Sequence, residues 1–381
     1  MGSRIICFGG IIRKKRNGGD LMKKNILIVD DSALMRRLLS DIIESDDRFR
    51  IAGVVRNGES ALRELENKSE EYDVVLLDFF LPDMNADELL QKLSMRRLRA
   101  KVIIISGIIK EDAMEVIRAL EDGAFDFVTK PESFSFTRSN GFAERLLACV
   151  ELATSTSEQS SAFVVKQEKK VKKPISINSN HVKKKGSVRG EKLVALACST
   201  GGPKALHQVI PKLPKNMDAP MVIVQHMPKG FTNSLAMRLN EMSQVEVKEA
   251  VNGDVLKKGC VYIAKGGMQM RIENDKGKKI LRLTDEPARN GLRPCADIMY
   301  ESLVGSDYQE IVCVVLTGMG GDGTAGIKQL NEKNNIYSIT QTAETCTVYG
   351  MPKVFYESGL ADEVVPLSKI ADAIGKRVGV Q

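Results

Sequence analysis

Residues 26–32 read Ile-Leu-Ile-Val-Asp-Asp-Ser, an apolar run that ends in two carboxylates and a hydroxyl. Similar apolar runs follow at residues 51–55, 74–77, 102–105 and 125–128. Amphipathic segments such as residues 32–44 and 87–98 separate these runs. Buried strands that alternate with helices are typical of a parallel sheet covered on both faces. We therefore predict a doubly wound, five-stranded parallel sheet within residues 23–150.

The rest of the chain divides into a second folded domain and two irregular segments. Residues 191–381 again alternate apolar runs with helical patterns, which predicts a doubly wound α/β domain. Turn signals across residues 245–283 indicate a β-hairpin insertion in that domain. Residues 151–190 are rich in Ser, Lys, Asn and Gln, and we interpret them as a flexible basic linker. Residues 1–22 form an extension that follows no pattern, and we hypothesise that residues 1–21 are non-functional or mis-assigned and that the protein starts at Met22.

Composition excludes several classes of protein. The 381 residues are 43% hydrophobic and 28% charged, as in ordinary globular chains. The net charge of +7 comes from the extension and the linker, so nucleic-acid binding by a folded surface is not indicated. No apolar run reaches the roughly 18 residues of a membrane span, and no signal peptide is evident. The seven Cys are scattered, form no zinc motif, and fit a reducing compartment. From these observations together we expect a cytoplasmic protein without membrane insertion.

Charged side chains follow the predicted strands of the first domain at their carboxyl ends. These residues are Asp30 and Asp31 after the first strand, Asp78 after the third, Ser106 after the fourth and Lys130 after the fifth. Ligands bind at this edge of a parallel sheet, and three carboxylates that converge there repel one another without a cation. Oxygen ligands of this kind suit Mg²⁺. We therefore predict a Mg²⁺ site formed by the three Asp, with Asp78 as the acceptor of a phosphoryl group. Helix capping by Asp and Ser is the alternative.

The same stretches resemble the receiver domain of two-component response regulators. The resemblance covers about residues 23–135 and is carried by residues 28–32, residues 75–78 with Pro82, Ser106, and residues 127–131. It implies a flavodoxin-like receiver in which Asp78 is the phosphoacceptor. It also implies that Asp30 and Asp31, together with Asp78, bind Mg²⁺ during phosphorylation.

The receiver resemblance further assigns a phosphorylation switch. It implies that Ser106 is the switch hydroxyl, Phe127 the switch aromatic residue and Lys130 the lysine that senses the phosphoryl group. One departure is visible, because Ala86 stands where receivers usually have Gly. This departure bears on the geometry of the loop and on the lifetime of the phosphoryl group, and less on the chemistry.

In the second domain, a Ser, a His and an Asp each follow a predicted strand. Ser199 lies in a Gly-rich turn before a helix, where the helix N-terminus can stabilise an oxyanion. His226 and Asp322 each come after an apolar run. A Ser needs a base to remove its proton, and a neutral His needs a carboxylate to fix its tautomer. The pattern therefore predicts a Ser199–His226–Asp322 triad at one edge of the sheet.

Other interpretations of this region stay open. A Ser after a strand can also cap a helix. The glycines of residues 318–323, with Glu344 about 20 residues further on, match a dinucleotide fingerprint, although Asp322 inside that loop would repel a pyrophosphate. Cys198 is a second candidate nucleophile, but it continues an apolar run and is interpreted as a buried structural thiol. Arg293 is a candidate substrate contact or a structural ion-pair partner.

Residues 191–381 resemble the catalytic domain of chemotaxis protein-glutamate methylesterases. The motifs that carry this resemblance are residues 199–203, 225–228, 230–232, 262–264, 293–294 with 296–297, 316–320 with 322–323, and 349–352. The resemblance implies that Ser199 is the nucleophile, His226 the base and Asp322 the residue that orients the base. It also implies that the backbone N–H of Met319 assists the oxyanion. Departures that bear on the substrate groove occur at Cys198, Lys265, Gln269 and Cys295.

Together, the two resemblances imply a phosphorylation-activated hydrolase of chemotaxis adaptation. Its substrates would be glutamyl methyl esters, and glutamines for deamidation, on the cytoplasmic helices of methylated chemoreceptors. A chemotaxis histidine kinase would be the phosphodonor, the esterase step would need no cofactor, and the unphosphorylated receiver would cover the esterase site. The alternatives are a small-molecule serine esterase, a receiver with a DNA-binding output and a degenerate scaffold. The second domain has no basic helix-turn-helix and retains all three triad residues, which disfavours the last two.

Overall fold

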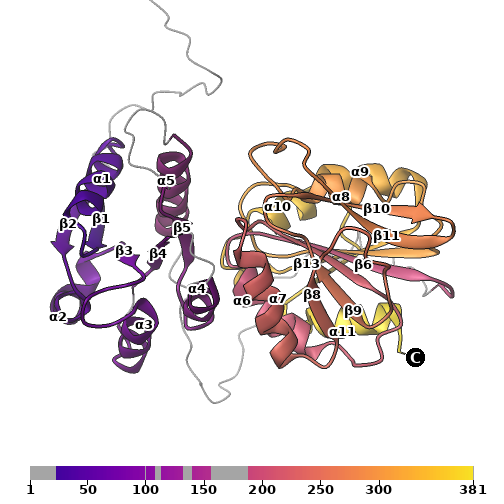
Figure 1. The fold of residues 1–381 in the computed structure, drawn as a ribbon, viewed down its shortest axis with the longest axis horizontal. Helices are drawn as coiled ribbons and strands as arrows, with labels where there is room; N and C mark the ends of the chain where they lie inside the picture. Colours follow the sequence, from indigo (N-terminus) through magenta and orange to yellow (C-terminus); the bar gives the residue numbers. More distant parts are fainter. Residues whose placement is uncertain (1–22, 99, 108–112, 132–139, 156–187, 381) are drawn as a thin grey trace, which may run out of the picture.

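The computed structural model describes residues 23–380, except residue 99 and residues 108–112, 132–139 and 156–187. The expectations for residues 1–22 and for most of the linker lie outside this part of the chain. Two α/β domains lie beside each other (Figure 1). Within the described ranges, every helix is too short or too polar to cross a bilayer.

The first domain is a five-stranded sheet in the order β2-β1-β3-β4-β5, with parallel pairing throughout. Its strands are β1 (Lys24–Val29), β2 (Phe49–Val55), β3 (Val74–Asp78), β4 (Val102–Ser106) and β5 (Asp126–Thr129). Its helices are α1 (Ala33–Glu44), α2 (Gly58–Lys68), the 3-10 turn η1 (Ser69–Glu71), α3 (Ala86–Met95), α4 (Ala113–Glu121) and α5 (Asn140–Ser155). Strands β3 and β4 are buried along their whole length, because helices cover both faces of the sheet. The fold predicted from the apolar runs is confirmed.

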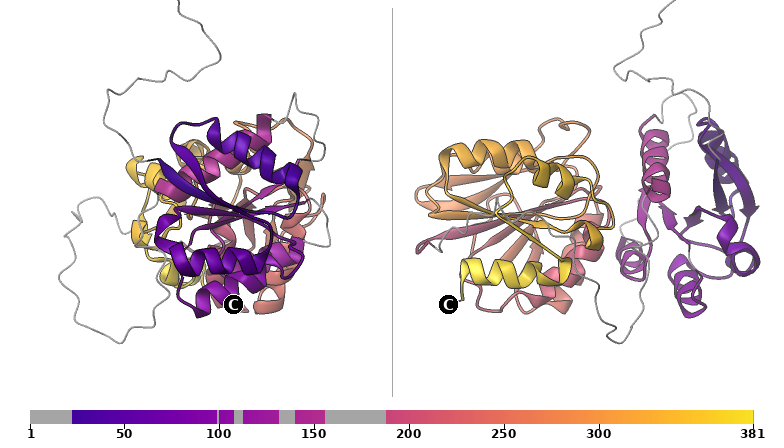
Figure 2. Two further views of the ribbon diagram at one scale, coloured as in Figure 1. Left: turned by 90° about the vertical axis from the view of Figure 1, so that its left-hand side faces the viewer. Right: turned by 180° about the vertical axis from the view of Figure 1, so that it is seen from behind.

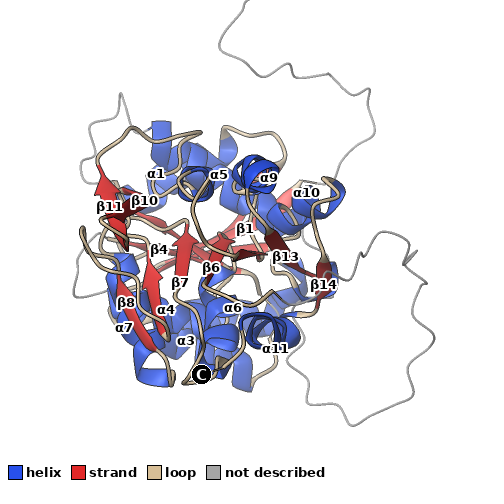
Figure 3. Ribbon diagram, turned by 90° about the vertical axis from the view of Figure 1, so that its right-hand side faces the viewer, coloured by secondary structure: helices blue, strands red, loops and turns tan. Residues whose placement is uncertain are grey.

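The second domain is built on a seven-stranded parallel sheet in the order β14-β13-β12-β6-β7-β9-β8. Its strands are β6 (Lys192–Cys198), β7 (Met221–Gln225), β8 (Glu246–Glu249), β9 (Cys260–Ile263), β12 (Glu310–Val315), β13 (Ile336–Gln341) and β14 (Glu363–Val365). Its helices are α6 (Gly202–Val209), η4 (Ile210–Lys212), α7 (Phe231–Met242), α8 (Ala296–Glu301), α9 (Thr324–Lys333), η5 (Ala343–Thr345), α10 (Met351–Glu357) and α11 (Leu367–Val378). Figure 3 shows helices on both faces of this sheet, which confirms the doubly wound prediction.

The hairpin insertion is smaller than the turn signals indicated. Strands β10 (Gln269–Asp275) and β11 (Lys278–Thr284) pair antiparallel around a turn at Lys276 and Gly277, which both have positive φ as a two-residue hairpin turn requires. The hairpin expectation is wrong for the preceding part, because β8 and β9 pair parallel in the main sheet. Residues 250–259 connect β8 and β9 as a crossover, so the turn signals there mark bends within the connection.

Helix α4 of the first domain packs against α6 and α7 of the second (Figure 2). Phe127 on β5 contacts Phe231 at the start of α7, with 4.6 Å between ring centroids. Glu121, which ends α4, accepts a hydrogen bond from Arg238 Nε at 3.0 Å and lies 2.5 Å from His207 Nε2. One continuous hydrophobic cluster includes buried residues of both domains. The interface is therefore a packed apolar surface with an ionic group at its margin.

Candidate functional site

Three carboxylates meet at the carboxyl-terminal edge of the first sheet. Oxygen atoms of Asp30, Asp31 and Asp78 all lie within 4.8 Å of one another. The ammonium of Lys130 lies 2.8 Å from Asp78 Oδ2 and 3.3 Å from Asp30 Oδ2. Burial raises the pKa of Asp78 to about 6, and Lys130 opposes this shift. The structure therefore brings these four side chains together at the edge of the sheet where the sequence predicted them. There, three carboxylates face one ammonium group.

The carboxylate cluster fits a hard divalent cation. Asp30 is fully buried, and its Oδ1 accepts a hydrogen bond from the backbone N–H of Ser32 at 2.8 Å. Asp30 Oδ2 accepts no hydrogen bond from the described residues, and its one charged neighbour among them is the Lys130 ammonium at 3.3 Å. Arg36 donates to the carbonyl oxygens of Asp30 and Asp31 at 2.8 and 2.9 Å, which fixes the loop that carries them. A buried oxygen of this kind, beside two further carboxylates, is the donor set that Mg²⁺ prefers.

Ser106 and Phe127 lie on the two strands nearest the second domain. Ser106 ends β4, is 1% exposed, and donates its hydroxyl hydrogen to the carbonyl oxygen of Gly107 at 3.3 Å. The backbone N–H of Lys130 donates to the carbonyl oxygen of Ser106 at 2.7 Å, which joins the ends of β4 and β5. Because Phe127 contacts Phe231, these strand ends connect the carboxylate cluster to the domain interface.

The alanine that replaces the usual receiver glycine is accommodated without strain. Ala86 is the first residue of α3, is fully buried, and donates its backbone N–H to the carbonyl oxygen of Phe79 at 2.9 Å. Its φ is not positive, so a Cβ costs nothing there. Phe79 is buried in the core, whereas Phe80 is 43% exposed beside Asp78. The substitution therefore leaves the local backbone in an ordinary helical start.

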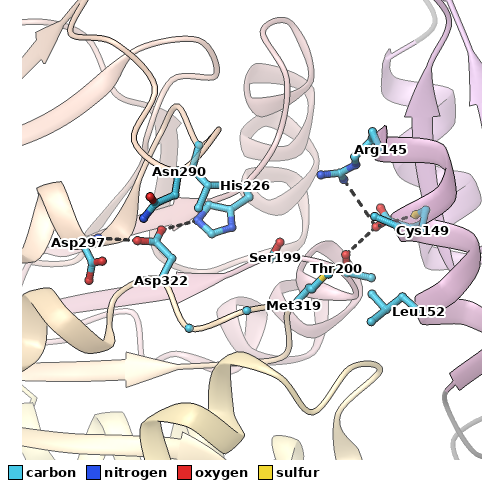
Figure 4. Close-up of a pocket in the computed structure, with 15 residues that line it drawn as sticks. Arg145, Cys149, Leu152, Ser199, Thr200, His226, Asn290, Asp297, Met319 and Asp322 are labelled. Atoms are coloured by element: carbon cyan, nitrogen blue, oxygen red, sulfur yellow. Dashed lines mark hydrogen bonds and ion pairs between the residues drawn. The ribbon is translucent and has the colours of Figure 1, made fainter. Parts of the chain in front are cut away.

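Ser199, His226 and Asp322 line one pocket of the second domain (Figure 4). Each residue lies in the loop after one of three adjacent strands, β6, β7 and β12. The side chains of His226 and Asp322 are nearly buried, with 5% and 7% exposed. Because parallel strands end at a common edge, the topology gathers residues that are far apart in the chain.

Several donors converge on the carboxylate of Asp322. His226 Nε2 lies 2.7 Å from Oδ2, and the backbone N–H of Ala296 donates to the same oxygen at 2.6 Å. The backbone N–H of Asp297 and the thiol of Cys295 donate to Oδ1 at 3.0 and 3.1 Å. Burial alone would raise the pKa of Asp322, but the bond to His226 and the N–H groups of α8 hold it well below its usual range. Asp322 is therefore a fixed negative charge beside the imidazole.

The contact with Asp322 distinguishes the two ring nitrogens of His226. Because Nε2 faces a carboxylate that only accepts hydrogen bonds, Nε2 carries the proton of the neutral ring, and Nδ1 is left as the basic atom. Ser199 Oγ makes no hydrogen bond to any described residue. The backbone N–H groups of Thr200 and Met319 likewise find no acceptor in the described part of the chain. The pocket thus contains a hydroxyl, an imidazole paired with a carboxylate, and two backbone N–H groups without an acceptor among the described residues.

The glycines of residues 318–323 permit close packing around the Ser199 turn. A Cβ on Gly318 would lie 2.7 Å from the Cβ of Ser199, and a Cβ on Gly323 would lie 3.2 Å from the ring of Tyr300. Real Cβ atoms almost never approach another atom as closely as 2.7 Å, so a side chain at position 318 would displace Ser199. Gly320 and Gly323 have φ of 80° and 93°, so close packing and the left-handed backbone together explain the glycines without a dinucleotide.

Two further residues that the sequence singled out lie away from the chemistry. Cys198 is fully buried, burial raises the pKa of its thiol, and it donates to Gln225 Oε1 at 3.0 Å. This environment is that of a structural thiol, because only the thiolate is a good nucleophile. Arg293 pairs with exposed Asp285 at 2.8 Å and does not line the pocket. The ion-pair interpretation of Arg293 is therefore the one that the structure supports.

The first domain forms one wall of the same pocket, which has a volume of about 390 Å³. Asp126, Arg145 and Cys149 line it from β5 and α5. The hydroxyl of Thr200 donates to Asp126 Oδ2 at 2.7 Å, directly beside Ser199 (Figure 4). Sequence reasoning missed these residues, because a contact between domains leaves no local motif in either segment.

The chain matches two families in sequence. CheB methylesterase matches residues 194–374, and the response regulator receiver domain matches residues 26–137. The protein-glutamate methylesterase/protein-glutamine glutaminase of Bacillus subtilis is 38% identical over 347 residues, which cover 90% of this chain and 95% of that protein. Protein-glutamate methylesterase/protein-glutamine glutaminase 1 of Syntrophomonas wolfei is also 38% identical, over 90% of this chain and 96% of that protein.

Two solved structures are also similar. The crystal structure of the Thermotoga maritima CheB methylesterase catalytic domain is 42% identical, covers 49% of this chain and 99% of its own, and has a TM-score of 0.47. The crystal structure of the response regulator domain of Thermotoga maritima CheB is 34% identical, covers 35% of this chain and 98% of its own, and has a TM-score of 0.31. From its identity to the curated relatives over nearly the whole chain, this protein belongs to the protein-glutamate methylesterase/protein-glutamine glutaminase family, with a receiver domain followed by a CheB methylesterase domain.

Proposed function

We propose that this protein is a phosphorylation-activated methylesterase that hydrolyses glutamyl methyl esters on chemoreceptor helices and deamidates receptor glutamines. The observation that carries the proposal is the pocket in which the His226–Asp322 pair lies beside the free hydroxyl of Ser199. The names of the relatives support the substrate class.

The arrangement supports acyl transfer by Ser199. Its Oγ attacks the γ-carbonyl carbon of the ester while His226 Nδ1 accepts the proton, and Asp322 stabilises the imidazolium that forms. The tetrahedral oxyanion accepts hydrogen bonds from the backbone N–H groups of Met319 and Thr200. The imidazolium returns the proton to the departing methoxide oxygen, and methanol leaves. Water then attacks the acyl-enzyme with the same base, which yields glutamate and restores Ser199. For a glutamine substrate the leaving group is ammonia.

We propose that Asp78 accepts a phosphoryl group from a chemotaxis histidine kinase. Asp30, Asp31 and Asp78 would hold Mg²⁺, which when bound neutralises charge on the phosphoryl oxygens. Lys130 already lies 2.8 Å from Asp78 and would pair with the phosphoryl group. The Ser106 hydroxyl, which now donates to Gly107, would turn toward the phosphoryl oxygens, and Phe127 would repack against Phe231.

We propose that the receiver, in this arrangement, restricts access to Ser199. A receptor helix is roughly 10 Å wide with its side chains, whereas α5 and the start of β5 close one side of the pocket. The Thr200–Asp126 hydrogen bond ties the receiver to the residue next to the nucleophile. We therefore assign this arrangement to the unphosphorylated, inhibited state.

We expect Asp78→Asn to retain basal methanol release from methylated receptor membranes and to lose stimulation by kinase or a small phosphodonor. The amide cannot accept a phosphoryl group, whereas the esterase pocket is untouched. Release of methanol is measured with and without phosphodonor. Asp47→Asn, an exposed carboxylate on the same domain, is the matched control and should keep full stimulation. Full stimulation of Asp78→Asn would refute the switch. Hydrolysis of simple esters without release from receptors would identify a small-molecule esterase instead.

We expect Glu121→Ala to raise basal methanol release by roughly 5- to 30-fold, because Glu121 pairs with Arg238 and His207 only while the domains are closed. The residue lies outside both the carboxylate cluster and the Ser199 pocket, so maximal phosphorylated activity should stay near that of the unaltered protein. Glu44→Ala, exposed on α1, is the control. Basal activity equal to that of the control variant would show that this ionic group does not hold the closed state.

A further inference from the structure

Gln225 joins the turn of the nucleophile to the turn of the base. It is the last residue of β7 and is 2% exposed. Its Nε2 donates to the carbonyl oxygen of Ser199 at 3.0 Å and to that of His226 at 3.1 Å. Its Oε1 accepts the thiol hydrogen of Cys198 at 3.0 Å. Both N–H bonds of one buried amide are therefore used on the main chains of two proposed catalytic residues.

The orientation of this amide is fixed by its surroundings. The reverse orientation would place Oε1 against two carbonyl oxygens, which is repulsive. Burial raises the pKa of the Cys198 thiol, so the thiol keeps its proton and remains a donor to Oε1. A Cβ at position 202 would lie 1.9 Å from Oε1, so Gly202 leaves the space that the amide occupies. The Gln225 amide therefore links the loop after β6 to the loop after β7 in one fixed orientation.

We propose that Gln225 is a positioning residue for acyl transfer, which holds the main chains of the Ser199 and His226 turns at a fixed separation. This inference rests on the proposed function. Gln225 does not line the pocket and acts only through the main chain of the two residues. A misplacement of about 1 Å between reacting groups can cost roughly 10²-fold in rate. The backbone bond from His226 N–H to the Cys198 carbonyl at 3.1 Å joins the same turns and keeps them together when the amide is lost.

The test is Gln225→Met in the full-length protein, because methionine matches the length of glutamine but offers no N–H. We expect kcat for methanol release to fall at least about 10-fold while KM changes less than about 2-fold. Rates are expressed per active site, counted by the burst of an activated small ester, so that partial unfolding does not imitate the effect. An unchanged kcat per active site, or a change confined to KM, overturns the proposal.

A second pair of variants keeps the proposal testable if Gln225→Met does not fold. Cys198→Ser keeps a donor to Oε1 and should retain a kcat near that of the unaltered protein, whereas Cys198→Ala removes the donor and should lower kcat by roughly 2- to 5-fold. Equal kcat values for the Ser and Ala variants contradict the role of the thiol in orienting the Gln225 amide, and with it the positioning role of Gln225. Absence of methanol release from the unaltered protein overturns the proposed function. Variants that match an active unaltered protein overturn only the positioning role.

Discussion

Ser199→Ala is expected to lower kcat for methanol release from methylated receptors by roughly 10³-fold or more, with little change in KM. The variant keeps the His226–Asp322 pair and the free N–H groups of Met319 and Thr200, but it has no atom that can form the acyl-enzyme. What activity remains would come from water bound in place of the hydroxyl. Release of methanol at saturating receptor, with phosphodonor present, measures the effect.

The control for this variant is Ser243→Ala at the end of α7. The Ser243 hydroxyl is buried without a hydrogen-bond partner among the described residues, so its removal should leave kcat unchanged. Phosphorylation of Asp78 in the Ser199 variant should also proceed normally, because the two sites are on different domains. Turnover near that of the unaltered protein would exclude Ser199 as the nucleophile.

Asp322→Asn is expected to lower kcat by roughly 10³- to 10⁴-fold, as expected when the carboxylate of a triad becomes an amide. Because an amide NH₂ cannot accept hydrogen bonds, Asn places that group either at the Oδ1 position, against the N–H of Asp297, or at the Oδ2 position, against the N–H of Ala296 and His226 Nε2. In both orientations, hydrogen bonds that fix the tautomer or the orientation of the imidazole are disturbed. The imidazolium also loses its neighbouring negative charge.

The control for this second prediction is a carboxylate on the surface of the same domain. Asp285→Asn is the matched control, because the Asp285 side chain is 83% exposed and pairs with Arg293 at the surface. A kcat for Asp322→Asn within about threefold of that control would contradict the triad.

The strand pattern and the residues at the strand ends were determined by the sequence alone. Apolar runs that end in Asp30, Asp78 and Lys130 predicted a parallel sheet with a charged edge, and the structure has that edge. The same reasoning located Ser199 and His226 after adjacent strands. It worked because burial of β-strands and their common direction are encoded within short segments.

The partners of those residues were decided only by the tertiary structure. The N–H groups of α8 that hold Asp322, the use of His226 Nε2, and the contact of Asp126 with Thr200 join segments that are far apart in the chain. The parallel pairing of β8 and β9 is a further example, because turn residues mark a bend but not the direction in which the next strand returns. Such contacts depend on how helices and loops pack over the sheet, and no local spacing of residues records that packing.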